Sequence, residues 1–276
     1  MLNNLKKWIY TAFTRRYIAY QWQPLFIYTA RLLEKLFGLA IFNYHGVKLL
    51  ASPVSYLDRH IILNKDINPL VTHAISQHLV AGGVFLDIGA NHGVFSLLAA
   101  KNPQTKVFAF EPSARELHRF WKNLALNPSN NISVLAYGVG EQEGRQDFML
   151  TGIENPGANS LPVIRDQGEL VTCHFSRLDK LLSVDLLKQV RVCKLDVEGQ
   201  EMFILNSLRP YLDLLKQCVF IVEVSPDLLP SVGASEKDIY HVFAEAGFQY
   251  QFGNPENLHQ WDEFFYHPEF TEELTI

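Results

Sequence analysis

The stretch VFLDIGANHGVFSLLAA, residues 84–100, decides the fold of this chain. Apolar residues lead into Asp87, Gly89 and Gly93 follow four residues apart, and an apolar run of small residues comes next. This pattern is typical of a buried parallel strand that turns directly into a helix. Because the glycines lack side chains, they allow the backbone to approach a ligand and the helix to begin tightly.

From residue 84 onwards, short apolar strands alternate with helical stretches, which indicates a parallel sheet covered on both faces. Strands are expected at 84–89, 106–112, 132–139, 190–199, 218–226, 248–252 and 263–268. Residues 139–180 are less regular, and GIENPGANS is expected to form a loop between strands. The predicted fold is therefore α/β, a Rossmann-like sheet of about seven mostly parallel strands that ends in a hairpin.

The first 83 residues follow a different pattern. Helices are expected at 2–16, 25–42 and 67–83, and two β-like runs around Ser52 and Pro53 predict a hairpin. We therefore divide the chain into a basic, aromatic-rich helical extension, residues 1–42, and a main domain, residues 43–276.

Charge is distributed unevenly along the chain. Residues 1–50 carry seven Lys and Arg residues and a single Glu, a net charge of +6, which leaves −11 on the rest. One face of the first predicted helix gathers Leu2, Leu5, Ile9, Ala12 and Phe13. No run of apolar residues in the extension is long enough to span a bilayer. It is expected either to contact an anionic membrane peripherally or to pack on its own domain or a partner.

Three cysteines, Cys173, Cys193 and Cys218, lie in apolar stretches and show no CxxC spacing. An odd number of such residues predicts buried thiols in a reduced, cytoplasmic compartment.

Glu111 ends the strand in FAFEP, about twenty residues after the glycine turn. An acid in this position can accept hydrogen bonds from both ribose hydroxyls of a nucleoside cofactor, as in NAD or S-adenosylmethionine. The turn DIGANHG is not GxGxxG, the pattern of pyrophosphate dinucleotide sites. S-adenosylmethionine is therefore favoured.

A second cluster of charge occurs in CKLDVEGQEMFIL, residues 193–205. Asp196 falls at a strand end, and Glu198 follows two residues later, beside Gly199. Glu198 and Glu201 can also be explained as acids that favour the start of a helix. Glu223 lies at the end of the next predicted strand, so its side chain is expected near the same edge of the sheet.

Taken in order, VFLDIGANHGVFS, VFAFEP, GANSL, RLDKLL and CKLDVEGQEMFIL resemble the motifs of the FkbM-type methyltransferases. The resemblance runs from about residue 67 to 268 and does not reach the basic extension. It implies a class I methyltransferase fold and an S-adenosylmethionine-dependent enzyme, in a family that consists mostly of O-methyltransferases of natural products and glycans.

The resemblance also implies roles for individual residues. The methionine end of the cofactor would be lined by Asp87, Gly89, Ala90, Asn91 and Gly93. The ribose and adenine would be held by Glu111, Pro112, Ser113, Gly138 and Val139. Asp196 would face the methionine amine or the acceptor, and His92 receives no role.

An aliphatic hydroxyl is a poor nucleophile, so a base or a metal should help to remove its proton. The candidates are Asp196 and Glu198, with Glu223 behind them, and His174 is a weaker one. A divalent cation could lie among the three acids, but no spacing requires one, so no metal ligand is predicted.

The predicted function is O-methylation of a hydroxyl on a sugar, glycan or lipid-linked small molecule. One alternative is a nitrogen or RNA methyltransferase, although the acidic body opposes nucleic acid binding. Another is a cofactor-binding partner protein without activity, which the intact motifs oppose.

Overall fold

Seven strands form the main sheet of the computed structural model, which describes residues 2–17, 19, 23–252 and 259–270. Their order across the sheet is β11-β12-β10-β9-β3-β4-β5. The bounds are β3 (Gly83–Ile88), β4 (Thr105–Phe110), β5 (Ile132–Leu135), β9 (Val190–Leu195), β10 (Val219–Val224), β11 (Gln249–Phe252) and β12 (Trp261–Tyr266). Strand β12 runs antiparallel to β10 and β11, and the other neighbours are parallel. The predicted α/β fold is confirmed.

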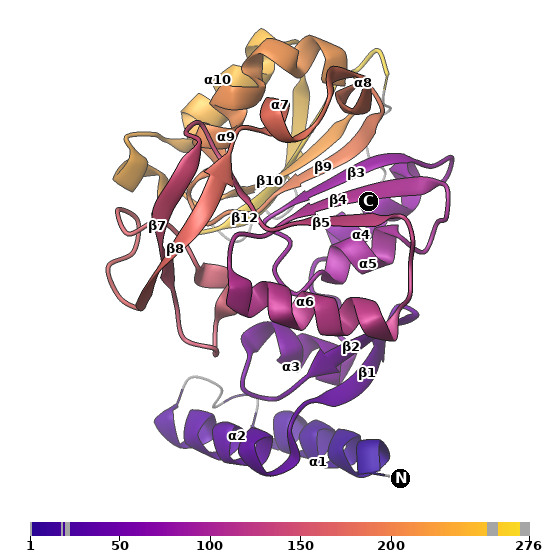
Figure 1. Cartoon of the computed structure of the whole chain (residues 1–276), viewed down its shortest axis with the longest axis vertical. Coiled ribbons are helices and arrows are strands. Elements are labelled where there is room, and N and C mark those ends of the chain that lie inside the picture. Colours follow the sequence, from indigo (N-terminus) through magenta and orange to yellow (C-terminus); the bar gives the residue numbers. More distant parts are fainter. Residues whose placement is uncertain (1, 18, 20–22, 253–258, 271–276) are drawn as a thin grey trace.

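Helices cover both faces of this sheet (Figure 1). One face carries α4 (Pro69–His78), α5 (Val94–Ala99) and α6 (Ala114–Leu126), and the other carries α7 (Leu178–Leu181), α8 (Val184–Leu187), α9 (Glu201–Leu208) and α10 (Glu236–Glu245). Strand β3 shows why both layers are needed, because successive side chains of a strand point to opposite faces. Leu86 and Ile88 pack in the core with α9 and α10, whereas Phe85 packs with α4.

A smaller sheet of three strands projects from the main one. It contains β6 (Gly138–Val139), β7 (Gly144–Leu150) and β8 (Glu169–Ser176), with a short 3-10 turn at Pro156–Ala158 in the connecting loop. The strand predicted at 132–139 is therefore two strands in different sheets. Gly138 lies under the ring of Phe175, which a β-carbon at this position would overlap.

The N-terminal region comprises α1 (Leu2–Tyr17), α2 (Pro24–Phe37), β1 (Ala40–Tyr44), β2 (Val47–Ala51) and α3 (Tyr56–Leu63). The prediction of a hairpin around Ser52 and Pro53 was wrong. The hairpin is β1–β2, and it turns at residues 45 and 46, which both have positive φ. The second helix ends earlier than predicted, because Gly38 takes a φ of +65° and stops it.

The hairpin packs directly on the main domain. Tyr10 and Leu49 share a core cluster with Leu97 of α5, and the side chain of Asn123 in α6 accepts a hydrogen bond from the backbone N–H of Leu50 at 2.9 Å. The boundary drawn between residues 42 and 43 therefore falls inside β1. All three cysteines are free and buried, as expected. No helix within the described ranges is long and apolar enough to cross a membrane.

Candidate active site

The site lies where the strand order of the main sheet reverses, beyond the carboxyl ends of β3 and β9. Strands β3 and β9 pair in parallel, and the loops that follow them touch at Gly89 and Asp196. A β-carbon on Gly89 would overlap the carbonyl oxygen of Asp196, and Gly89 has a φ of +83°. Gly89 is therefore required for contact between the two loops as well as for access by a ligand.

Glu111 connects the loops after β3 and β4. One carboxylate oxygen accepts a hydrogen bond from the backbone N–H of Asn91, and the other accepts one from the N–H of Ser113, both at 2.9 Å. Burial raises the pKa of Glu111 to about 8. These bonds hold the carboxylate in one orientation at the wall of a cavity.

The first cavity opens to solvent and spans about 560 Å³, including its mouth. Eight of the predicted site residues line it: Gly89, Asn91, Glu111, Pro112, Gly138, Val139, Asp196 and Glu198. The remaining wall includes residues that sequence reasoning missed: Ile88, Phe110, Tyr137, Phe148, Pro156, Gly157, Asn159, Phe175, Val197 and Gln200. Several of these come from the small sheet and its loop. For the residues of the small sheet and its loop, the GANS segment was the only indication in the sequence. The direction in which an aromatic side chain of these strands points depends on how the strands pair.

Three predicted residues, Asp87, Gly93 and Ser113, line neither this cavity nor the second cavity that adjoins it. Asp87 is buried beneath it, where it accepts a hydrogen bond from the Ser96 hydroxyl at 2.6 Å. Gly93 packs against the ring of Phe120, and the Ser113 hydroxyl caps α6. These residues shape the site from behind.

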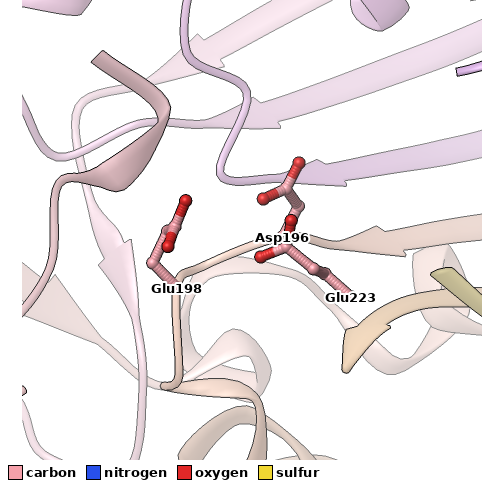
Figure 2. A group of neighbouring side chains, drawn as sticks. All are labelled: Asp196, Glu198 and Glu223. Carbon is pink, nitrogen blue, oxygen red and sulfur yellow. The ribbon is translucent and has the colours of Figure 1, made fainter. Parts of the chain in front are cut away.

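Three carboxylates gather at the ends of β9 and β10, beside the first cavity and a second one that adjoins it. Oxygens of Asp196, Glu198 and Glu223 all lie within 4.8 Å of one another, as the predicted grouping required (Figure 2). Asp196 and Glu198 come from the loop after β9, and Glu223 comes from β10. Such a set could hold a divalent cation, although basic side chains already contact two of its members. Lys194 contacts Asp196 at 2.6 Å, and Arg165 contacts Glu198 at 3.0 Å.

Burial controls the protonation of this group. Burial and the charge of Asp196 raise the pKa of Glu198 to about 7, against the opposing effect of Arg165. Burial, followed by the charges of Asp196 and Glu198, raises the pKa of Glu223 well above its usual range. One oxygen of Glu223 accepts a hydrogen bond from the Gln260 amide. Burial therefore disfavours the ionised form of Glu223, and the protonated form can act as a hydrogen-bond donor.

A second cavity adjoins the first, opens to solvent and spans about 1090 Å³, including its mouth. The two cavities share Gly89, Asn91, Pro156, Gly157 and Asp196. Among the three acids, Asp196 lines both cavities, Glu198 lines the first only, and Glu223 lines the second only. The other walls of the second cavity include Tyr56, Leu57, Ile67, Asn68, Ala90, His92, Val94, Phe95, Asn155, Lys194, Gln260, Trp261 and Asp262.

The two histidines considered in the sequence analysis, His92 and His174, lie in different surroundings. His92 is buried and lies 2.8 Å from a carboxylate oxygen of Glu116, so it is held within the protein. His174 lies on the exposed side of β8 and lines neither cavity, so the structure does not support it as a catalytic base.

A sheet of this order, with a cavity at its switch point lined by Glu111 and apolar side chains, is that of a class I methyltransferase fold. The sequence pattern of the methyltransferase FkbM domain matches residues 87–250, more than half of the chain. The chain belongs to the FkbM methyltransferase family, and its cofactor is S-adenosylmethionine.

Two curated relatives agree with this assignment. Methyltransferase 1 of Beauveria bassiana is 26% identical over 200 residues, which cover 64% of this chain and 76% of the relative. The hexuronic acid methyltransferase AglP of Haloferax volcanii is 27% identical over 163 residues, which cover 59% of this chain and 62% of the relative. The match therefore spans less than two thirds of AglP.

Among solved structures, TYW2 of M. jannaschii in complex with AdoMet is similar, with a TM-score of 0.41 and 14% identity. The match covers 83% of this chain and 86% of TYW2.

The residues of the first cavity fit this cofactor. Glu111, with its fixed carboxylate oxygens, would accept hydrogen bonds from the ribose diol, and Val139, Phe148 and Phe175 would provide apolar surface for the adenine. The buried side-chain oxygen of Asn91 has no hydrogen-bond partner among the described residues, so an ammonium group of the methionine part could donate to it.

Proposed function

We propose that this protein methylates a hydroxyl of an uncharged sugar or glycan, with the cofactor in the first cavity and the acceptor in the second. The observation that carries the proposal is the position of Asp196 in the shared wall, beside both cavities. A group there can touch the acceptor oxygen at the point where the methyl group passes from one cavity to the other.

When bound, S-adenosylmethionine supplies a methyl group already activated by a sulfonium. The chain then has to orient the acceptor and take its proton. We assign proton removal to Asp196, which Lys194 holds by an ion pair of 2.6 Å. Glu223 donates a hydrogen bond to the acceptor, and Glu198 contacts the cofactor from the first cavity.

The charge of the second cavity supports an uncharged acceptor. Its walls carry the carboxyl groups of Asp196, Glu223 and Asp262 and a single ammonium, that of Lys194. Burial, followed by the charge of Asp196, raises the pKa of Asp262 only to about 6, so Asp262 is ionised at neutral pH. The name of AglP indicates a hexuronic acid substrate. A carboxylate on the acceptor would meet like charge here, and so would the phosphates of RNA.

Aromatic and amide side chains in the same walls also suit a sugar. Tyr56 and Trp261 offer ring surface, and Asn68 and Gln260 offer amide groups for hydrogen bonds to hydroxyls.

The test uses cofactor with a labelled methyl group and a panel of neutral hexosides, matched hexuronosides and short RNA. Label should enter the neutral hexosides and be stable to base, as expected for an ether. Label in hexuronosides or RNA only, or in no acceptor although the cofactor binds, would contradict the proposal.

Three variants separate the roles of the acids. Asp196→Asn should slow single-turnover transfer by about 10²–10⁴-fold and leave the Kd for S-adenosylhomocysteine nearly unchanged. Glu198→Gln should raise that Kd, and Glu223→Gln should raise the acceptor KM. If Asp196→Asn transfers methyl at the wild-type rate, Asp196 is not the base.

A further inference from the structure

Helices α1 and α2 form a layer at one end of the molecule, and we call residues 2–17 and 24–37 the α1–α2 layer (Figure 1). Polar contacts tie its inner side to the hairpin and to the turn between α2 and β1. The Asn3 side chain donates a hydrogen bond to the carbonyl of Ile41 at 3.2 Å and accepts one from its N–H at 2.8 Å. The Tyr10 hydroxyl donates to the carbonyl of Gly38 at 2.6 Å. The orientation of the layer is therefore fixed.

The outer side of α1 is apolar, which is the reverse of an ordinary surface helix. Leu2, Leu5 and Trp8 recur every third residue and are all exposed, with Trp8 70% exposed. Lys6 and Lys7 turn partly inward instead. The Lys6 ammonium donates to the carbonyl of Leu39, and the Lys7 ammonium lies over the ring of Phe42.

The outer side of α2 repeats this arrangement. Leu25, Tyr28, Leu32 and Leu36 follow the spacing of one helical face, and Leu25 is 73% exposed. Phe26 and Ala30, on the opposite face, are buried. Both helices therefore bury one face against the protein and leave an apolar stripe without a partner among the described residues.

These stripes form a concentrated patch. Of the nineteen large apolar side chains that are exposed in the described residues, eight belong to the α1–α2 layer, and the others are spread along residues 56–270. An accumulation of large exposed apolar side chains in one layer is typical of a binding surface.

The charges beside the patch are positive. Arg15, Arg16 and Lys35 are exposed in the layer. The only acid in residues 1–42 is Glu34, whose carboxylate accepts a hydrogen bond from the hydroxyl of Ser52. The layer therefore combines apolar side chains, Trp and Tyr among them, with uncompensated basic residues.

We propose that the α1–α2 layer docks on the surface of a bilayer that contains anionic lipids. Apolar side chains with Trp and Tyr enter the boundary between headgroups and acyl chains, and Arg and Lys meet the anionic headgroups. A second copy of the chain fits less well. A twofold dimer through this layer would bring the basic residues of both copies into one interface.

The experiment is cosedimentation of the full chain with vesicles of equal parts phosphatidylcholine and phosphatidylglycerol, compared with vesicles of phosphatidylcholine alone. The protein should bind the mixed vesicles at low salt, bind the neutral ones less, and be released by high salt. Arg15→Gln with Arg16→Gln should lower the partition coefficient on the order of tenfold or more. Trp8→Gln with Leu32→Gln should abolish binding.

Trp121→Gln is the matched control, because Trp121 is 51% exposed on α6, outside the layer. It should bind vesicles as the wild type does. Binding of S-adenosylhomocysteine by every variant verifies the fold and keeps this test independent of turnover. Failure of the wild type to bind mixed vesicles, or equal binding by the layer variants, would overturn the proposal. The proposal would also be overturned if the wild type binds no vesicles but is a dimer, and Trp8→Gln makes it monomeric. The layer would then be an interface with a second copy of the chain.

Discussion

The ammonium of Lys194 lies 2.6 Å from a carboxylate oxygen of Asp196, and Lys194 is only 3% exposed. Burial opposes its charge, but the carboxylates of Asp196 and Asp87 outweigh this effect and raise the pKa of Lys194. A single buried cation thus balances acids at the ends of β3 and β9. The active site depends on it for its charge and for the position of Asp196.

Replacement of this cation should destabilise the protein. Lys194→Met leaves buried carboxylates without a counter-charge, which should lower the free energy of unfolding by about 3–5 kcal/mol. Lys106→Met is the control, because Lys106 is exposed on β4 of the same sheet and should change stability by less than about 0.5 kcal/mol. Urea unfolding measures both values. Equal effects of the two variants would show that the ion pair does not stabilise the fold.

The contact between the loops after β3 and β9 can be tested with two glycines of similar conformation. Gly89 and Gly233 have φ of +83° and +73°, but only at Gly89 would a β-carbon meet other atoms. Gly233→Ala should therefore cost about 1 kcal/mol of strain alone. Gly89→Ala should cost a further ~1–3 kcal/mol and weaken cofactor binding. Urea unfolding and calorimetry with S-adenosylhomocysteine measure these effects, and equal losses would argue against the steric account.

Glu111→Gln should weaken binding of S-adenosylhomocysteine by about 1–3 kcal/mol, because charge-assisted hydrogen bonds to the ribose are lost. Calorimetry measures the Kd. Glu143→Gln, at an exposed acid outside the cavity, is the control and should bind normally. Tight binding of NAD with no response to S-adenosylhomocysteine would contradict the cofactor assignment.

The pKa of Glu111 also predicts how cofactor affinity depends on pH. Burial raises this pKa to about 8, so the free protein carries a proton on Glu111 below that value. The ribose hydroxyls donate to the ionised form, so binding must release this proton. Affinity should therefore increase as the pH rises towards about 8 and level off above it. This dependence should vanish in Glu111→Gln, and a pH-independent wild type would refute it.

Removal of divalent cations should leave the rate of methyl transfer unchanged. Lys194 and Arg165 already contact Asp196 and Glu198, and burial disfavours the charged form of Glu223. Initial rates before and after treatment with EDTA provide the measurement. A rate that falls on chelation and returns with added magnesium would instead indicate metal-assisted deprotonation at the three acids.

The sequence by itself determined the main sheet, the glycine turn at Gly89, and the acids at strand ends that include Glu111 and Asp196. These features follow from patterns within a few residues: apolar runs, alternation, and turns that need glycine. Because parallel strands end at one edge of a sheet, the gathering of Asp196, Glu198 and Glu223 followed from the same reasoning.

Only the tertiary structure decided which side chains reach the cavities and which way the N-terminal helices face. Phe148 and Phe175 line the first cavity because β7 and β8 pair with each other. The apolar stripe of α1 faces outward because Asn3 bonds to the hairpin and Tyr10 bonds to Gly38 at the end of α2. An amphipathic pattern specifies that two faces differ. Which face is buried depends on partners distant in sequence, whose contacts form only when the chain folds.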